Sequence, residues 1–201
     1  MPSTIKARLA IFASGGGSNA DQICAYFDGH PSIAVAAIIT NNPKAGVIDV
    51  AGRHEVSCYT VTKKNWETDS VMAPILEYHH ITHIILAGFL LLVPEWLIRK
   101  YPSRIVNIHP ALLPKYGGKG MYGHHVHDAV KKSGDAISGI TIHLVDEHYD
   151  EGDILFQHKV GLQPDDSVDL IARRVLAAEH YYFSRVIEKW VLGERIQFDP
   201  A

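Results

Sequence analysis

Residues 9–20, LAIFASGGGSNA, give the strongest indication of the fold. Leu9 to Ala13 is a short apolar run, which predicts a buried strand. Ser14 to Asn19 is a glycine-rich turn, with Ser18 and Asn19 as candidate caps of a following helix. The helix itself is indicated by apolar residues at helical spacing: Ala20, Ile23, Cys24 and Phe27. A strand that passes through such a turn into a helix is typical of an α/β fold.

The same alternation continues for about a hundred residues. Further strands are predicted at residues 33–39, 58–61, 81–86 and 104–108. Helices are predicted near Val47, over residues 66–78 and from Pro94 in a first turn. Continuous apolar strands of this kind predict an open, mostly parallel twisted sheet with helices on both faces. Ligands bind beyond the carboxyl ends of such strands, here residues 14–19, 40–42, 87–93 and 107–110.

The second half of the chain has a different pattern. Residues 117–123, GGKGMYG, predict a mobile loop. Residues 140–145 and 154–160 predict two strands joined by a hairpin-like turn at residues 150–153, an antiparallel C-terminal extension. Residues 171–186 predict a long amphipathic C-terminal helix, capped near Asp165 or Asp166. We expect a single domain over residues 1–201, with halves of about 1–103 and 104–201.

Composition narrows the class of protein. The 201 residues are 47% apolar and 20% charged, which argues against disordered, collagen-like and disulfide-rich chains. A net charge of −3 offers no electrostatic footprint for nucleic acid or an anionic membrane. The longest apolar run, residues 84–93, is shorter than the about 20 residues that span a bilayer. Two cysteines without a CxxC pattern, and no visible signal peptide, predict a cytoplasmic protein.

The glycine turn is the first candidate binding site. A helix N-terminus offers free N–H groups and a positive dipole end, which suit a phosphate. Residues 15–20 formally fit the dinucleotide pattern GxGxxA, but the second strand ends in Thr40-Asn41-Asn42 without a carboxylate for a ribose diol. No GK[ST] follows the glycines either. A monophosphate or ribose phosphate is favoured, and a tight turn with a helix cap is the alternative.

A second candidate site is NIHP, residues 107–110. Asn107 and His109 lie two residues apart at a predicted strand end, so their side chains share one face. An amide donor beside an imidazolium donor can stabilise an oxyanion. The alternative is that both residues merely cap the strand end.

The clusters of acidic residues and of histidines do not by themselves indicate which residue has a functional role. The predicted turn after the sixth strand holds several acids, Asp146, Glu147, Asp150, Glu151 and Asp153. Any of them could orient a histidine and raise its pKa. His124, His125 and His127 could bind a metal, but no clear fourth ligand follows from the sequence, so we expect no metal.

Taken together, the motifs resemble one family along essentially the whole chain. AIFASGGGSNA, IILAGF at residues 84–89 and RIVNIHPALLPKY at residues 104–116 are similar to glycinamide ribonucleotide formyltransferases of purine synthesis. SGITIHLVDEHYDEGDILFQ at residues 138–157 and AEH at residues 178–180 agree with them. The resemblance implies a Rossmann-like formyltransferase fold, with a ribonucleotide-binding N-terminal half and a catalytic and folate-binding C-terminal half.

The resemblance also implies the site residues. Asn107, His109 and Asp150 match the catalytic trio, and His143 matches a histidine near it. The ribonucleotide site matches Gly16, Gly17, Ser18, Asn19, Asn107 and Glu179. The folate site matches Lys64, Leu90, Leu91, Leu92, Val93 and Asn107, with Lys63 as the alternative lysine. His125 and His127 match an H-x-H element.

Two departures from the family pattern stand out. Leu91 occupies a position where some members have arginine, so a polar folate contact is missing there. The stretch from Gly117 to Gly123 is longer than in compact members, which changes the loop over the site.

The implied reaction transfers a formyl group from 10-formyltetrahydrofolate, a co-substrate, to the amine of glycinamide ribonucleotide. The amine attacks directly, Asn107 and protonated His109 stabilise the oxyanion, and Asp150 assists. The alternatives are a formyltetrahydrofolate hydrolase and a non-catalytic sugar-phosphate-binding domain. We expect small-molecule substrates only and a monomer or homodimer.

Overall fold

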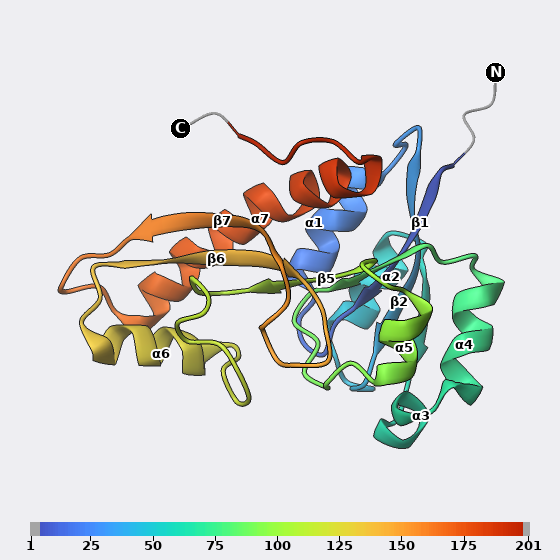
Figure 1. Ribbon diagram of the computed structural model, residues 1–201, viewed down its shortest axis with the longest axis horizontal. Helices are drawn as coiled ribbons and strands as arrows, with labels where there is room; N and C mark the ends of the chain where they lie inside the picture. The colour runs from blue at the N-terminus through green and yellow to red at the C-terminus, as the bar shows by residue number, and fades with distance from the viewer. Residues whose placement is uncertain (1–4, 199–201) are drawn as a thin grey trace.

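The computed structural model describes residues 5–198, which form one seven-stranded sheet in the order β3-β2-β1-β4-β5-β6-β7 (Figure 1). The strands are β1 (Ala7–Phe12), β2 (Ile33–Thr40), β3 (Ser57–Thr60), β4 (His83–Leu86), β5 (Ile105–His109), β6 (Ile137–Leu144) and β7 (Ile154–Gly161). The first five are parallel to one another, while β6 pairs antiparallel with both β5 and β7. This confirms the predicted open, mostly parallel sheet with an antiparallel extension.

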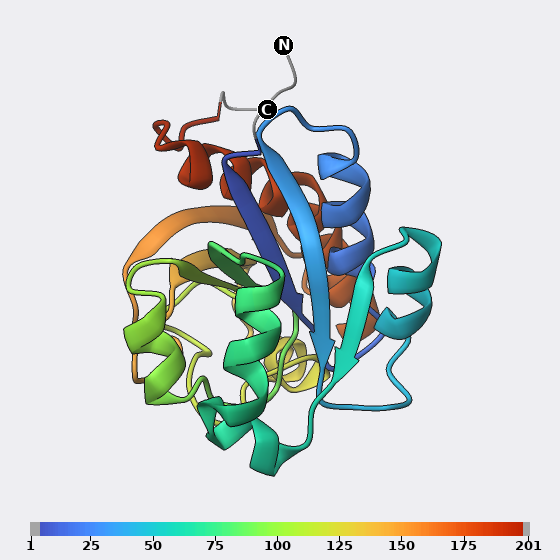
Figure 2. The ribbon, with the colours of Figure 1, turned by 90° about the vertical axis from the view of Figure 1, so that its right-hand side faces the viewer.

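Helices cover both faces of the sheet, as predicted (Figure 2). They are α1 (Ser18–Phe27), α2 (Val47–Arg53), α3 (Lys63–Glu67), α4 (Asp69–Tyr78), α5 (Glu95–Lys100), α6 (His124–Ser133) and α7 (Val168–Leu192). None of the helices within residues 5–198 is both long enough and apolar enough to cross a membrane.

The core consists of two apolar layers, one on each face of the sheet. One layer joins β1 and β6 to α1, α2 and α7 and includes Ile23, Val50 and Phe183. The other joins the opposite faces of β1, β2 and β4 to α3, α4 and α5, and includes Trp66 and Met72. Because the central strands bury side chains on both faces, their sequences show the continuous apolar runs from which the parallel sheet was predicted.

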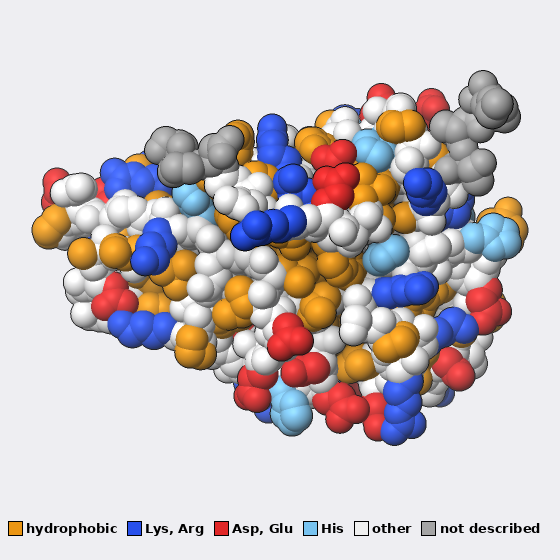
Figure 3. Space-filling view, turned by 45° about the horizontal axis from the view of Figure 1, so that its top comes forward, with side chains coloured by type: hydrophobic (Ala, Val, Ile, Leu, Met, Phe, Trp, Pro, Cys, Tyr) orange, Lys and Arg blue, Asp and Glu red, His pale blue; other side chains and the backbone are white. Residues whose placement is uncertain are grey.

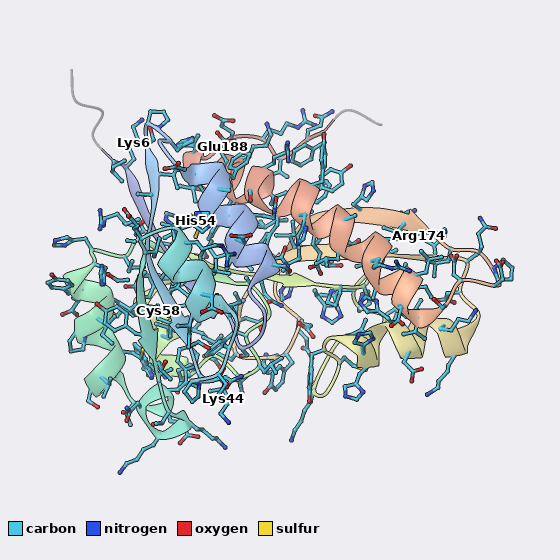
Figure 4. The ribbon with its side chains drawn as sticks, turned by 180° about the vertical axis from the view of Figure 1, so that it is seen from behind. Lys6, Lys44, His54, Cys58, Arg174 and Glu188 are labelled. Atoms are coloured by element: carbon cyan, nitrogen blue, oxygen red, sulfur yellow. The ribbon has the colours of Figure 1, made fainter. Side chains whose placement is uncertain are left out.

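Helix α7 runs along the sheet and packs against α1 (Figure 4). Near its C-terminal end, Glu188 accepts a hydrogen bond of 2.5 Å from the Tyr26 hydroxyl of α1. Near its N-terminal end, Arg174 donates to the buried carboxylate of Asp166 at 2.6 Å. These contacts tie the C-terminal helix to both halves of the chain.

Three local predictions were wrong. The N-cap of α1 is Gly17, in a left-handed conformation, and neither Ser18 nor Asn19 caps the helix. The side chain of Ser167, one residue after Asp166, caps α7, while Asp166 accepts from the backbone N–H of Gln163. The single helix predicted over residues 66–78 is two helices. They separate at the extended residue Thr68, while Pro74 lies inside α4.

The surface carries charges of both signs. On the face drawn in Figure 3, basic and acidic side chains are interspersed with apolar ones. Apolar residues in exposed positions include Ile137 and Ile154 at the two ends of the β6–β7 extension and Tyr181 on α7.

Candidate active site

A cleft of about 790 Å³ lies at the carboxyl ends of β1, β4 and β5. Its walls also come from the Gly118–Gly123 loop, the loop that follows β6, and helices α6 and α7. The sequence placed ligand binding at this edge of the sheet. Residues 40–42, which were expected there as well, do not line the cleft.

Asn107, His109 and Asp150 meet in this cleft although they come from two separate stretches of chain. The Nδ2 of Asn107 lies 3.5 Å from Oδ1 of Asp150. The Nδ1 of His109 lies 3.6 Å from the other carboxylate oxygen, Oδ2. His143 joins them from β6, because the register of the β5–β6 pair places it directly opposite Asn107. An amide, two imidazoles and a carboxylate therefore converge at one point.

His143, the histidine beside the trio, carries a proton on Nδ1. His143 donates from Nδ1 to the Leu144 carbonyl at 2.8 Å. Its Nε2 lies 3.1 Å from Nδ2 of Asn107 and 3.5 Å from Oδ1 of Asp150, so the ring contacts both residues. His143 thus orients the amide of Asn107, a role that needs the tertiary register of two strands.

Asp150 is held as a carboxylate by its surroundings. Burial alone would raise its pKa, but His143, His109 and the Gly118 backbone N–H together lower the pKa below its ordinary value. The Gly118 N–H donates to Oδ2 at 2.9 Å. The loop of residues 118–123 therefore supplies a backbone N–H donor to Asp150.

Opposing effects act on the pKa of His109. Burial lowers its pKa below the ordinary value, although Asp150 and the Tyr116 carbonyl both act to raise it. Its Nε2 donates to that carbonyl at 2.8 Å. Asp150 acts to raise the pKa of His109, as expected, but burial outweighs this effect, and Nδ1 faces the carboxylate at 3.6 Å.

The glycine turn is shaped partly by packing. Gly17 has a φ of +79°, and a Cβ there would lie 2.8 Å from the Cα of Val47, so glycine is required. A Cβ on Gly15 or Gly16 would meet no atom within 4 Å. The first two glycines therefore leave open space. Of the predicted phosphate-site residues, Asn19 lines the cleft, while Gly16, Gly17 and Ser18 lie beside it.

Ser14 was predicted only as the first residue of the glycine turn, without a role of its own. Its hydroxyl donates to Oδ1 of Asn41 at 2.6 Å and accepts from the backbone N–H of Leu90 at 3.0 Å. It therefore ties the ends of β1, β2 and β4 together. The Nδ2 of Asn42 also donates to the Ser14 carbonyl. Asn41 and Asn42 therefore support the cleft through Ser14, although they do not line it.

Glu179 faces the cleft from α7 and is 7% exposed. It accepts a hydrogen bond of 2.7 Å from Nδ2 of Asn19, a residue 160 positions away in the sequence. Burial raises the pKa of Glu179 to about 7, against the effect of this hydrogen bond. The first and last helices thus bring an amide and a carboxyl group together.

The raised pKa of Glu179 predicts a pH-dependent stability. Ionising this carboxyl costs more in the folded than in the unfolded chain, so stability falls as pH rises from about 4.5 to about 7. Glu179→Gln removes this loss. We expect the variant to gain about 2 kcal/mol of unfolding free energy relative to wild type between pH 5 and pH 8. Urea denaturation of both proteins at the two pH values measures the difference, and an equal gain at both would contradict it.

The predicted folate wall, Leu90 to Val93, lines the cleft after β4. Trp66 of α3 fixes this loop by donating from Nε1 to the Leu92 carbonyl at 2.7 Å. Leu90 and Leu92 are unusually exposed for leucine, at 48% and 44%. Lys64 lies on α3, exposed and outside the cleft lining.

The histidines of α6 separate into two groups. His124 and His127 line the cleft, whereas His125 is exposed and does not. Within residues 5–198, no three histidine, cysteine or acidic side chains are grouped so that they could hold a metal ion.

Comparison with known proteins assigns the family. The formyl transferase family model matches residues 7–187. The chain belongs to the formyl transferase family. Among curated members, the Arabidopsis thaliana protein named phosphoribosylglycinamide formyltransferase, chloroplastic, is 39% identical over 199 residues. That match covers 95% of this chain and 67% of the plant protein. The chain spans 60% of the length of a second plant member, from Vigna unguiculata.

Bacterial members match over nearly their whole length. The Bacillus subtilis phosphoribosylglycinamide formyltransferase is 31% identical over 191 residues, which is 92% of this chain and 95% of that protein. The crystal structure of the enzyme of that name from Anaplasma phagocytophilum superimposes with a TM-score of 0.85 at 28% identity, covering 93% of this chain and 87% of that one. The family resemblance and the fold predicted from the sequence are confirmed.

Proposed function

We propose that this formyl transferase moves a formyl group from 10-formyltetrahydrofolate to the amine of glycinamide ribonucleotide in purine biosynthesis. The observation that carries the proposal is the convergence of Asn107, His109 and Asp150 in a cleft that also reaches Asn19 and Glu179. The names of the matched relatives agree with this reaction.

The two substrates are assigned to opposite ends of the cleft. The ribonucleotide phosphate lies against the glycine turn and the N-terminus of α1, whose free N–H groups attract anions. Glu179 accepts from the ribose hydroxyls, and Leu90 to Val93 pack against the pteridine ring. The formyl group and the amine then meet at Asn107, which contacts both substrates.

The chemical step begins when the amine nitrogen attacks the formyl carbon. A C–N bond forms, and the carbonyl electron pair moves to oxygen. Asn107 offers a ready N–H donor to that oxyanion, since its carboxamide is already oriented by His143. His109 in its protonated form is a second donor at Nδ1 and keeps that proton through the step, and Asp150 and the growing negative charge both favour this form.

Collapse of the intermediate needs a proton at the leaving nitrogen. Asp150 accepts a proton that the attacking amine loses, directly or through water, and delivers it to the folate nitrogen. The C–N bond to folate then breaks, which leaves formylated ribonucleotide and tetrahydrofolate. The lowered pKa of Asp150 keeps this side chain a carboxylate, which can accept the proton from the amine.

A transfer assay that omits each substrate in turn tests the proposal. We expect formylated ribonucleotide only when both are present. Formate released from the folate without ribonucleotide would instead indicate a hydrolase, and ligand binding without any product would indicate a binding domain.

The ribonucleotide assignment makes a separate prediction. The double variant Ser18→Ala, Asn19→Ala removes side-chain donors at the turn and frees Glu179 from its partner. We expect the KM for the ribonucleotide to rise about tenfold or more, while the KM for the folate changes little. Steady-state kinetics with each substrate varied in turn measure both. Equal changes in the two KM values would contradict the phosphate assignment.

We further propose that the chain acts in the cytoplasm, as a monomer or homodimer and on small molecules without nucleic acid or membrane partners. Cys24 and Cys58 are free thiols, which suits a reducing compartment. The plant relatives are named chloroplastic.

A further inference from the structure

His127 is a buried polar side chain on the cleft wall. It lies on α6, is 7% exposed and lines the cleft. Its Nδ1 is buried and has no hydrogen-bond partner among residues 5–198. Because Nδ1 is sealed off, Nε2 is the ring nitrogen that a molecule in the cleft can reach.

A purely structural role does not explain this histidine. A buried nitrogen without a partner costs stability, whereas an apolar side chain at the same place would not carry that cost. The nearest aromatic neighbour on α6 is His124, whose ring lies edge-on at 6.5 Å. A polar group kept at such a cost on a cleft wall points to a ligand.

The surroundings indicate which part of a ligand it meets. Burial lowers the pKa of His127 to about 4, with smaller effects of His124 and His109. The imidazole is thus neutral near pH 7 and has no charge to offer a phosphate. His127 lines the same cleft as His109 and Glu179, and its helix α6 packs against α7, which carries Glu179. His127 therefore borders the space between the reacting amine and the ribose.

We propose that His127 binds the ribonucleotide by donating a hydrogen bond from Nε2 to an uncharged oxygen between the phosphate and the amine. A ribose hydroxyl and the glycinamide carbonyl are the groups of that kind. The tautomer follows from the burial of Nδ1, since orphaned buried N–H groups are rarer than under-satisfied acceptors. This inference rests on the proposed function, because it assumes the ribonucleotide as ligand.

Three variants test the contact, because each places a different group at the ring position. Glutamine puts an N–H donor near the place of Nε2, asparagine near that of Nδ1, and leucine supplies no donor. We expect His127→Leu and His127→Asn to weaken the Kd for glycinamide ribonucleotide about five- to tenfold, and His127→Gln to stay within about threefold of wild type. The KM for the folate should not change, and the Tm of His127→Leu should equal or exceed that of wild type.

His125→Gln is the matched control, since His125 is exposed on the same helix and lies outside the cleft lining. It should leave the Kd unchanged. An unchanged Kd in His127→Leu, or a weakened Kd accompanied by a lower Tm, would overturn the contact. Calorimetric titration separates this from the wider proposal. A wild-type protein that binds the ribonucleotide but transfers no formyl group would overturn the reaction, while the Kd comparison would still decide on His127. A wild-type protein that does not bind it would overturn both.

Discussion

Asp150→Asn is expected to lower kcat by about 10³ while the protein stays folded. The change keeps the shape of the side chain, and an amide oxygen can still accept from the Gly118 N–H. It removes the negative charge that opposes the effect of burial on the pKa of His109. It also removes the base that carries the proton from the amine to the leaving nitrogen. Both losses fall on the chemical step, so the KM values should change much less than kcat.

The neighbouring Glu151→Gln is the control for this variant. Glu151 is exposed in the same turn and carries the same charge. Removing its charge tests whether any negative charge in this turn affects the rate. Single-turnover rates of the two variants and circular dichroism of both give the comparison. A rate for Asp150→Asn within threefold of wild type would reject the assigned role.

Asn107→Asp is expected to be more damaging than Asn107→Ala. Alanine removes one oxyanion donor, which costs about 10²–10³ in kcat. Aspartate is nearly isosteric but offers an acceptor in place of the donor, and it places a second carboxylate where Nδ2 now lies 3.5 Å from Oδ1 of Asp150. Two carboxyl groups so close disfavour double ionisation, which raises the pKa of one of them.

The pH dependence distinguishes this electrostatic explanation from a steric one. At lower pH the introduced carboxyl group is protonated and regains a donor, so the activity of Asn107→Asp should rise as pH falls from 8 to 6. Asn107→Ala should show no such rise. The ratio of the two kcat values across this range is the measurement, and a constant ratio would contradict the oxyanion role of Asn107.

Strand pattern was predictable where burial is two-sided. The runs at residues 33–39 and 81–86 are apolar because helices cover both faces of β2 and β4, so local sequence and tertiary environment agree. The ends of the helices were harder to predict from the sequence. The cap of α1 depends on the close approach of Val47, from another helix, to Gly17. The break between α3 and α4 at Thr68 has no proline or glycine beside it that would have predicted it.

In the site, local spacing was enough to predict that Asn107 and His109 share one face of a strand end, because side chains alternate along a strand. It also indicated the glycine turn, and a resemblance to a known family selected Asp150 among several acids. The packing of the elements sets the rest: His143 lies opposite Asn107, Asn19 reaches Glu179, and burial lowers the pKa of His109. Strand register, contacts between residues 160 positions apart and desolvation all depend on how the elements pack, and local spacing does not encode that packing.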